Sequence, residues 1–345
     1  MKDVDSSSVN LIVTSPPYPM IEMWDNMFMR QNAKISEALK NGNGTLSFDL
    51  MHKELDPVWE ECWRVLKEGG FACINIGDAT RTINNNFSLY SNHSRIISKM
   101  LELGFNVLPV ILWRKQTNAP NKFMGSGMMP AGAYVTLEHE YILIFRKGGK
   151  RVFKTNEEKI NRRHSAFFWE ERNNWFSDVW MDLKGASQVL FDNKTRKRNA
   201  SFPFELPYRI INMYSAKGDT VLDPFLGLGT TSFAAIASAR NSIGFEIEKE
   251  FKDQIVSKVK EIVSLSNDRI DKRLKDHIDF VEERVNLKHE NKYYNFPVVT
   301  NQEKELLINE LISVEEKGKN TFEANYSVEP QNRSTRMVQL KLLDL

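Results

Sequence analysis

The stretch that decides the fold is GDTVLDPFLGLGTTSFAAIASARNSIGFEIEKEF, residues 218–251. It predicts a short buried strand with Asp223 at its carboxyl edge. Gly227 and Gly229 then supply a tight turn, and an apolar helix begins near Thr230. Glycines at such a turn let a ligand lie against the backbone, and the helix amino terminus offers free N–H groups. The unit therefore predicts a ligand site at one edge of a sheet.

The kind of ligand is indicated by two acidic residues of this stretch. Glu246 stands at the end of the next predicted strand, where a carboxylate can accept hydrogen bonds from ribose hydroxyls, so an adenosine-containing cofactor is expected. The segment DPFLGLG begins with Asp-Pro where a dinucleotide fingerprint would begin with glycine. A carboxylate there can receive an ammonium group and would repel a pyrophosphate. This favours S-adenosylmethionine, and the alternative is a glycine turn that only packs a helix on a sheet.

Predicted strands and helices alternate along the rest of the chain. Apolar runs typical of strands lie at 10–14, 71–77, 105–115 and 134–148, and helical patterns lie at 50–67, 94–104 and 202–215. The strands at 105–115 and 134–148 are expected to be antiparallel to each other. The alternation predicts an α/β fold with a mostly parallel, twisted sheet covered by helices on both faces.

A second unusual stretch is LIVTSPPYPM, residues 11–20, where two prolines and an aromatic ring follow a short apolar strand. Proline lacks a backbone N–H and has a fixed φ, so this turn offers carbonyl acceptors in a stiff frame. Such acceptors can hold the exocyclic amine of a nucleobase as it attacks a methyl group. Ser15 adds a side-chain acceptor, and Tyr18 can stack on a base swung out of a duplex. Taken alone, the motif would be a surface turn.

Basic and aromatic residues are concentrated between Arg146 and Ala200. This stretch has 14 Lys and Arg against 7 Asp and Glu, whereas the whole chain has a net charge of only +2. The interleaved aromatic residues include Phe153, Phe167, Phe168, Trp169, Trp175, Phe176 and Trp180. This combination suits a nucleic-acid surface, because phosphates need cations and bases need rings to stack on. An aromatic mini-core with a solvated basic face explains it equally well.

Together these motifs resemble the S-adenosylmethionine-dependent DNA amino-methyltransferases, specifically their circularly permuted β group. In that group the S/D-P-P-Y motif comes first, then a target-recognition region, then the cofactor motif. Here the order is TSPPY (14–18), the basic aromatic stretch, and LDPFLGLGTT (222–231) with GFE (244–246). Supporting matches are LKEGGFACINIGD (66–78), EHEYILIFRKG (138–148) and ASFPFELPYRII (200–211). The resemblance covers roughly residues 8 to 262 and implies a Rossmann-like methyltransferase fold with an inserted target-recognition region.

The resemblance also assigns site residues. Ser15, Pro16 and Pro17 would hold the target amine, and Tyr18 would stack on the flipped base. The residues expected along the cofactor are Asp223, Pro224, Phe225, Gly227, Gly229, Thr230 and Glu246, with Phe202 and Pro203 beside it. The expected DNA contacts are Arg162, Arg163, Lys194, Arg196, Lys197 and Arg198. The cofactor is S-adenosylmethionine, and no metal is needed because the sulfonium is its own leaving group.

We expect four parts along the chain: a catalytic part (1–146), a target-recognition region (147–198), a cofactor-binding part (199–264) and a charged C-terminal extension (265–345) with weak helical patterning at 303–316. Family members usually carry a further strand of GD type ahead of SVNLIVTSPPY. That strand is expected to be absent from this chain, which begins MKDVDSSSVNLIVTSPPY.

The leading function is a site-specific DNA methyltransferase acting on double-stranded DNA in a restriction–modification system, beside a separate cognate endonuclease. Ser-Pro-Pro-Tyr is commoner among cytosine-N4 enzymes of the family, so cytosine N4 is favoured. The alternatives are an adenine-N6 DNA methyltransferase, an RNA amino-methyltransferase, and a catalytically inactive DNA-binding remnant that lacks the N-terminal strand. The target sequence cannot be derived from residues 147–198, because no code links such side chains to bases.

Composition sets the remaining expectations. The chain has no 18-residue apolar run and no signal peptide, which predicts a cytoplasmic protein without membrane contact. Cys62 and Cys73 each lie in an apolar stretch, so buried thiols are expected rather than a disulfide or a zinc site. The sequence leaves the oligomeric state open.

Overall fold

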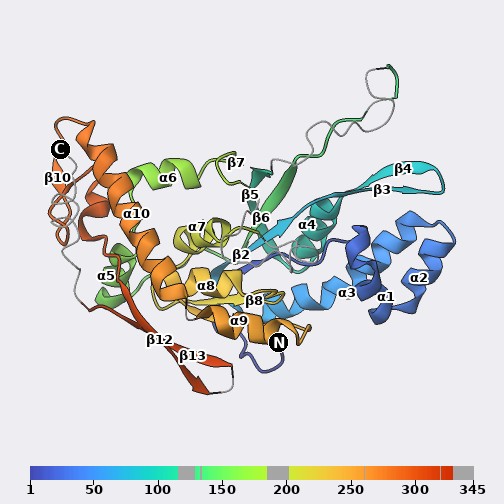
Figure 1. The fold of residues 1–345 in the computed structure, drawn as a ribbon, viewed down its shortest axis with the longest axis horizontal. Coiled ribbons are helices and arrows are strands. Elements are labelled where there is room, and N and C mark those ends of the chain that lie inside the picture. Colours follow the sequence, from blue (N-terminus) through green and yellow to red (C-terminus); the bar gives the residue numbers. More distant parts are fainter. Residues whose placement is uncertain (116–128, 133, 185–201, 260, 319, 329–345) are drawn as a thin grey trace.

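A seven-stranded sheet in the order β7-β5-β6-β2-β1-β8-β9 forms the centre of the computed structural model (Figure 1). The structure describes residues 1–115, 129–132, 134–184, 202–259, 261–318 and 320–328. The strands of this sheet are β1 (Val9–Thr14), β2 (Leu66–Ile76), β5 (Phe105–Arg114), β6 (His139–Lys147), β7 (Val179–Trp180), β8 (Thr220–Asp223) and β9 (Asn241–Gly244). Strand β6 runs antiparallel to β2 and β5, and the other pairings are parallel. The predicted mostly parallel sheet and its antiparallel pair are confirmed.

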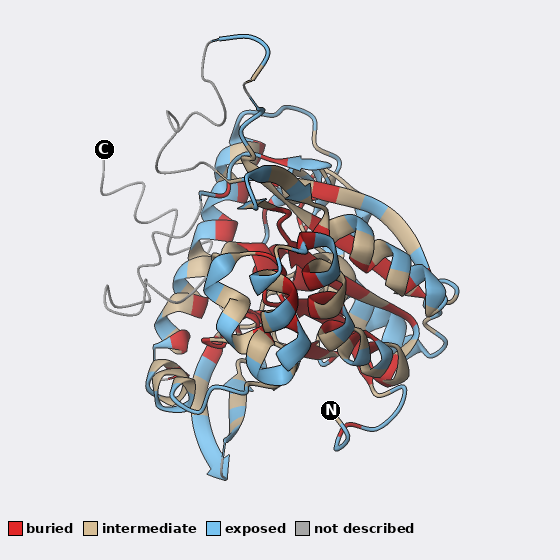
Figure 2. Ribbon diagram, turned by 90° about the vertical axis from the view of Figure 1, so that its right-hand side faces the viewer, coloured by how far each residue is buried: buried red, intermediate tan, exposed pale blue. Residues whose placement is uncertain are grey.

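Helices cover both faces of the sheet. Helices α3 (Gly44–Val65) and α4 (Asn92–Glu102) pack on one face, and α7 (Glu205–Tyr214), α8 (Thr230–Ala237) and α9 (Phe251–Val259) pack on the other. Side chains of a strand point alternately to its two faces. Accordingly, Ile12 of β1 belongs to the first core, and its neighbours Leu11 and Val13 belong to the second. Figure 2 shows the buried residues gathered inside this arrangement.

Smaller elements follow the carboxyl ends of β1 and β2. A 3-10 helix (Glu22–Trp24), α1 (Asp25–Gln31) and α2 (Ala33–Lys40) follow β1. A hairpin of β3 (Ala79–Ile83) and β4 (Asn86–Tyr90) follows β2. Two hydrogen bonds of 2.7 and 2.9 Å from Arg81 to Asp25 tie this hairpin to α1. These elements therefore form one group beside the end of β1.

Two predicted helical patterns differ from the structure. The pattern at 50–67 underestimates α3, which begins at Gly44 because the Asn43 side chain accepts a hydrogen bond from the Leu46 N–H. The expected helical pattern at 303–316 is wrong. A 3-10 helix (Asn301–Glu305) is followed there by strand β12 (Leu311–Gly318), which pairs with β13 (Thr321–Tyr326).

The expected C-terminal extension (265–345) and the expected target-recognition region (147–198) share a hydrophobic core. Helix α10 (Ile262–Glu282) contributes Ile270 and Leu274 to this core. Phe168, just before α6 (Trp169–Trp175), lies among them with Phe296, which precedes β11 (Pro297–Val298). The remaining elements of these regions are α5 (Asn156–His164) and β10 (His289–Glu290). The extension is thus packed against the region that precedes α7.

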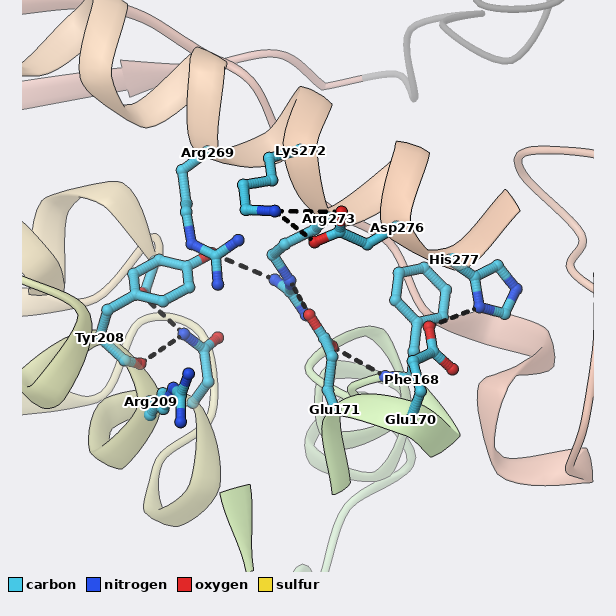
Figure 3. A network of polar contacts seen from close by, with 12 residues as sticks. Phe168, Glu170, Glu171, Tyr208, Arg209, Arg269, Lys272, Arg273, Asp276 and His277 are labelled. Atoms are coloured by element: carbon cyan, nitrogen blue, oxygen red, sulfur yellow. Dashed lines mark hydrogen bonds and ion pairs between the residues drawn. The ribbon is translucent and has the colours of Figure 1, made fainter. Parts of the chain in front are cut away.

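Buried ion pairs reinforce this contact between α6 and α10 (Figure 3). Arg273 donates to both carboxylate oxygens of Glu171 at 2.5 and 2.7 Å, and to the Tyr208 hydroxyl at 3.2 Å. Burial opposes the charge of Arg273, but Glu171 and Tyr208 outweigh it and raise the pKa of the guanidinium. His277 lies 2.8 Å from Glu170 and stacks on Phe168 with ring centroids 4.0 Å apart.

Cys62 and Cys73 are free and buried, which confirms the predicted thiols. Burial raises the pKa of both. Among the described residues, no helix is both long and apolar enough to cross a membrane.

Arg273→Ala should destabilise the fold strongly, since it leaves the Glu171 carboxylate buried without its cation. Breaking one side of such a pair costs about 3–5 kcal/mol. The neighbouring Lys272→Ala is the matched control, because the Lys272–Asp276 pair is exposed and such pairs contribute about 0–1 kcal/mol. Urea unfolding followed by circular dichroism measures both, and equal midpoints for the two variants would contradict the structural role of Arg273.

Candidate active site

A pocket of about 900 Å³ lies at the carboxyl ends of β1 and β8. The chain leaves these neighbouring parallel strands in opposite directions, from β1 toward β2 and from β8 toward β9. Open α/β sheets bind their ligands at such a point. The predicted site residues that line the pocket are Ser15, Pro16, Pro17, Phe202, Asp223, Pro224, Phe225, Gly227, Thr230 and Glu246.

Asp223 lies at the centre of this arrangement and is only 2% exposed. Its carboxylate accepts hydrogen bonds from the Thr14 hydroxyl at 2.5 Å, the Thr231 hydroxyl at 2.7 Å and the Phe225 N–H at 3.0 Å. Burial raises the pKa of Asp223 to about 6, although these hydrogen bonds oppose the shift. The group is therefore mainly ionised at neutral pH, and these hydrogen bonds fix its position.

The glycine turn is held by Glu246 at the end of β9. Its carboxylate accepts a hydrogen bond from the Gly227 N–H at 2.7 Å and from the Glu248 N–H at 2.8 Å. Gly227 and Gly229 have φ of +54° and +86°, a backbone region that favours glycine. Gly229 is the residue before α8, so the turn aims the amino terminus of that helix at the sheet edge. Each Glu246 oxygen keeps acceptor capacity for a ligand hydroxyl.

Tyr18 of the proline motif does not line the pocket, and its hydroxyl lies in a polar cluster. Its hydroxyl donates to Glu140 at 2.9 Å, accepts from the Asn75 amide at 2.8 Å and lies 3.2 Å from the Ser15 hydroxyl. Lys115 also donates to Glu140 at 2.8 Å. Burial and the charge of Glu140 raise the pKa of Tyr18 well above its usual value. The ring is thus a neutral, firmly held phenol, 8% exposed.

Other predicted residues fall outside the pocket wall. Tyr18, Gly229 and Pro203 do not line it. Arg162 lines a different cavity, and Arg163 pairs with Glu305 at 2.8 Å. Lys194, Arg196, Lys197 and Arg198 lie outside the described residues. The structure therefore unites most of the proposed catalytic and cofactor residues, but it does not place Arg162 or Arg163 beside them.

Several pocket residues carry no motif in the sequence. They come from the 3-10 helix, α1 and α3, and include Trp24, Asn26, Met27, Arg30, Glu54 and Val58. The indole N–H of Trp24 is buried without a hydrogen-bond partner in the described structure. A buried donor without a partner is costly, so a ligand acceptor is a natural partner for it. Only the position of Trp24 just after TSPPY hinted at this from the sequence.

A Rossmann-like sheet, a proline turn and two acidic strand ends around one pocket define the methyltransferase class of α/β enzymes. The model of the N6/N4-type DNA methylase family matches residues 9–257. The chain belongs to this family of S-adenosylmethionine-dependent DNA amino-methyltransferases, and its activity is DNA methylation.

Two relatives extend this comparison. The chain is 56% identical to the Type II methyltransferase M.MthZI of Methanothermobacter thermautotrophicus over 307 residues, which cover 89% of this chain and 86% of the relative. It is 52% identical to the Type II methyltransferase M.MjaI of Methanocaldococcus jannaschii over 270 residues, covering 75% and 88%.

A solved structure has a similar fold. It is that of a candidate DNA modification methylase from Thermus thermophilus, complexed with S-adenosyl-L-methionine. The TM-score is 0.58 at 29% identity, over 76% of this chain and 89% of that one.

The pocket fits the family's cofactor on its own chemistry. Its volume of about 900 Å³ lies within the range of sites for small ligands. A fixed carboxylate at Asp223 suits a ligand with an ammonium and a sulfonium, and the acceptors of Glu246 suit ribose hydroxyls.

Cofactor affinity should depend on pH through Asp223. Because its pKa is about 6, protonation below that value removes the negative charge that attracts a cation. The Kd for S-adenosylmethionine should therefore rise below pH 6, approaching about tenfold per pH unit. Titration calorimetry from pH 5 to 8 measures this, with circular dichroism to confirm folding at each pH. Asp223→Asn should weaken binding and remove the dependence, and an unchanged pH dependence in this variant would contradict the assignment.

Two substitutions of Tyr18 test whether methyl transfer depends on its aromatic ring or on its hydroxyl. Tyr18→Ala should lower turnover on the order of 100-fold, with Kd for S-adenosylmethionine nearly unchanged because the ring does not line the pocket. Tyr18→Phe keeps the ring, and Asn75 still donates to Glu140 at 2.7 Å, so most activity should remain. Single-turnover methylation assays compare the two. Equal losses in both variants would show that the hydroxyl, not the ring, is required.

Proposed function

We propose that this protein methylates the N4 amine of cytosine at a specific sequence in double-stranded DNA, as the modification enzyme of a restriction–modification system. The observation that carries the proposal is the position of Ser15, Pro16 and Pro17 in the wall that also contains Asp223 and Glu246. A base amine held by the proline turn would then face a methyl group held by the acidic strand ends.

The residues divide this work between them. S-adenosylmethionine, when bound, supplies an electrophilic methyl group. Asp223 and Glu246 orient the cofactor, while the turn at Pro16 and Pro17 keeps carbonyl acceptors rigid around the incoming amine. The Ser15 hydroxyl can accept a hydrogen bond from that amine or donate one to the ring beside it. Tyr18, held by Glu140 and Asn75, would act on the base rather than on the cofactor.

Cytosine is favoured over adenine by the first residue of the motif. Cytosine carries the acceptor N3 beside its amine, and a serine hydroxyl can donate to it, whereas an aspartate cannot when ionised. In the family, Ser-Pro-Pro-Tyr is also the commoner form among cytosine-N4 enzymes. Adenine N1 could be served by the same hydroxyl, so adenine N6 is the second candidate.

The biological setting is proposed from the relatives. M.MthZI and M.MjaI are both named Type II methyltransferases, which supports a cytoplasmic modification enzyme acting beside a separate cognate endonuclease. The family description as a DNA methylase favours DNA over RNA as substrate.

The target base can be measured directly. Plasmid DNA from a host without DNA methylation is treated with the protein and S-adenosylmethionine, digested to nucleosides and analysed by mass spectrometry. We expect N4-methylcytosine, and none with the matched variant Asp223→Ala. N6-methyladenine alone would contradict the choice of base, and the absence of any modified base would contradict the proposal as a whole.

A further inference from the structure

A second cavity, of about 720 Å³, lies at the opposite edge of the sheet from the active-site pocket. Asn10 of β1 lines this cavity, whereas Ser15, just past the other end of β1, lines the pocket. Five residues of strand separate them by roughly 17 Å. The cavity is also lined by Lys67 near the start of β2, by Arg146 of β6 and by residues of the α5–α6 segment. We call it the distal cleft.

The distal cleft carries an excess of positive charge. Its lining cations are Lys67, Arg146, Lys150, Arg151, Arg162 and Arg172, and its lining carboxylates are Glu68 and Glu303. Within the described part of the chain, only Arg151 of these cations lies within ion-pair distance of a carboxylate, 2.5 Å from Asp219. Glu303 is buried and already accepts hydrogen bonds from the Trp169 and Thr300 N–H groups. Such a cleft attracts anions.

One aromatic ring of the lining, that of Phe153, lies directly beside two of these cations. Phe153 is close to two guanidinium groups, with its ring centroid 4.6 Å from Arg151 and 4.8 Å from Arg162. Trp169, also in the lining, keeps 39% of its surface exposed. Phe153 is half-buried, and Arg162 beside it has no ion pair in the described part of the chain. A ring or guanidinium plane of this kind can stack on a base while neighbouring cations bind its phosphate.

The cations of the distal cleft are accessible to a ligand from solution. Lys150, Arg162 and Arg172 are exposed, so a phosphate can reach them without rearrangement of the sheet. The volume suits a ligand of one or two nucleotides. A base paired in a duplex has its faces covered by neighbouring bases, so stacking in the cleft requires an unpaired base.

We propose that the distal cleft binds a nucleoside phosphate, with the base stacked on Phe153 or Trp169 and the phosphate held by Lys150 and Arg162. The ligand is either a free nucleotide or an unpaired nucleotide of a DNA strand. This site is separate from the pocket in which the methyl group is transferred, and it does not depend on which base is methylated.

The binding test blocks the active-site pocket first. Titration calorimetry is carried out on the full chain with saturating S-adenosylhomocysteine, using thymidine 5′-diphosphate in one arm and an oligonucleotide of eight thymidines in the other. We expect saturable binding in at least one arm. Tighter binding of the oligonucleotide identifies a strand as the ligand, and equal binding identifies a free nucleotide. No binding in either arm overturns the proposal.

Variants locate the binding in the cleft. Lys150→Glu combined with Arg162→Glu should raise Kd at least about tenfold, whereas Lys275→Glu, an exposed lysine on α10 outside the lining, should leave it unchanged. Phe153→Ala should weaken thymidine 5′-diphosphate about tenfold and inorganic pyrophosphate little. Equal effects of Lys275→Glu, or equal affinity of the wild type for pyrophosphate and the nucleotide, would overturn the assignment. Methylation of duplex DNA by the wild type is measured separately, so failure here is distinguishable from failure of the proposed function.

Discussion

The buried carboxylate of Asp223 joins the part of the chain that carries the proline motif to the part that carries the glycine turn. Asp223 ends β8, and it accepts a hydrogen bond from Thr14, which ends β1 although it lies 209 residues earlier in the chain. A second hydroxyl, from Thr231 in the first turn of α8, binds the other carboxylate oxygen. The motif that would hold the base and the motif that would hold the cofactor therefore meet through a single side chain. Because the group is desolvated, loss of either threonine would leave the carboxylate short of a donor.

This constraint explains why the neighbouring elements are arranged as they are. With the ends of β1 and β8 fixed together, the glycine turn follows one strand and the proline turn follows the other. Glu246 then joins the end of β9 to the same edge by binding the Gly227 N–H. On the far side of the proline turn, Glu140 of β6 and Asn75 of β2 hold Tyr18. Residues at the ends of five strands thus fix this edge of the sheet.

The parts of the site that sequence could predict are those carried by local chemistry. A few neighbouring residues are enough to recognise a glycine turn, prolines at a strand end or an acidic residue after a buried strand. The sequence therefore located Asp223, Gly227 and the TSPPY turn. The burial of Tyr18 could not be predicted, because its partner Glu140 is 122 residues away. Arg162 and Arg163 belong to the same basic stretch of sequence as Lys194 and its neighbours. Composition alone cannot show at which end of the strands each residue of such a stretch lies. The strand at Leu311–Gly318 was not predicted, because contacts distant from its local sequence stabilise it. These are its pairing with β13 and its packing on α10 and α8.

The shared core of α6 and α10 would limit how the segment expected to recognise the DNA target could be exchanged. Phe168, Glu170 and Glu171, at the start of α6, contact His277 and Arg273 of α10. Replacing residues 147–198 with those of a relative would separate these partners. Buried charges on α6 and on α10 would then lack their counter-charges. Recombination that exchanges residues 147–198 would therefore have to transfer the two segments as a pair, or adjust one to the other, and hybrids made at the sequence boundary alone would fold poorly.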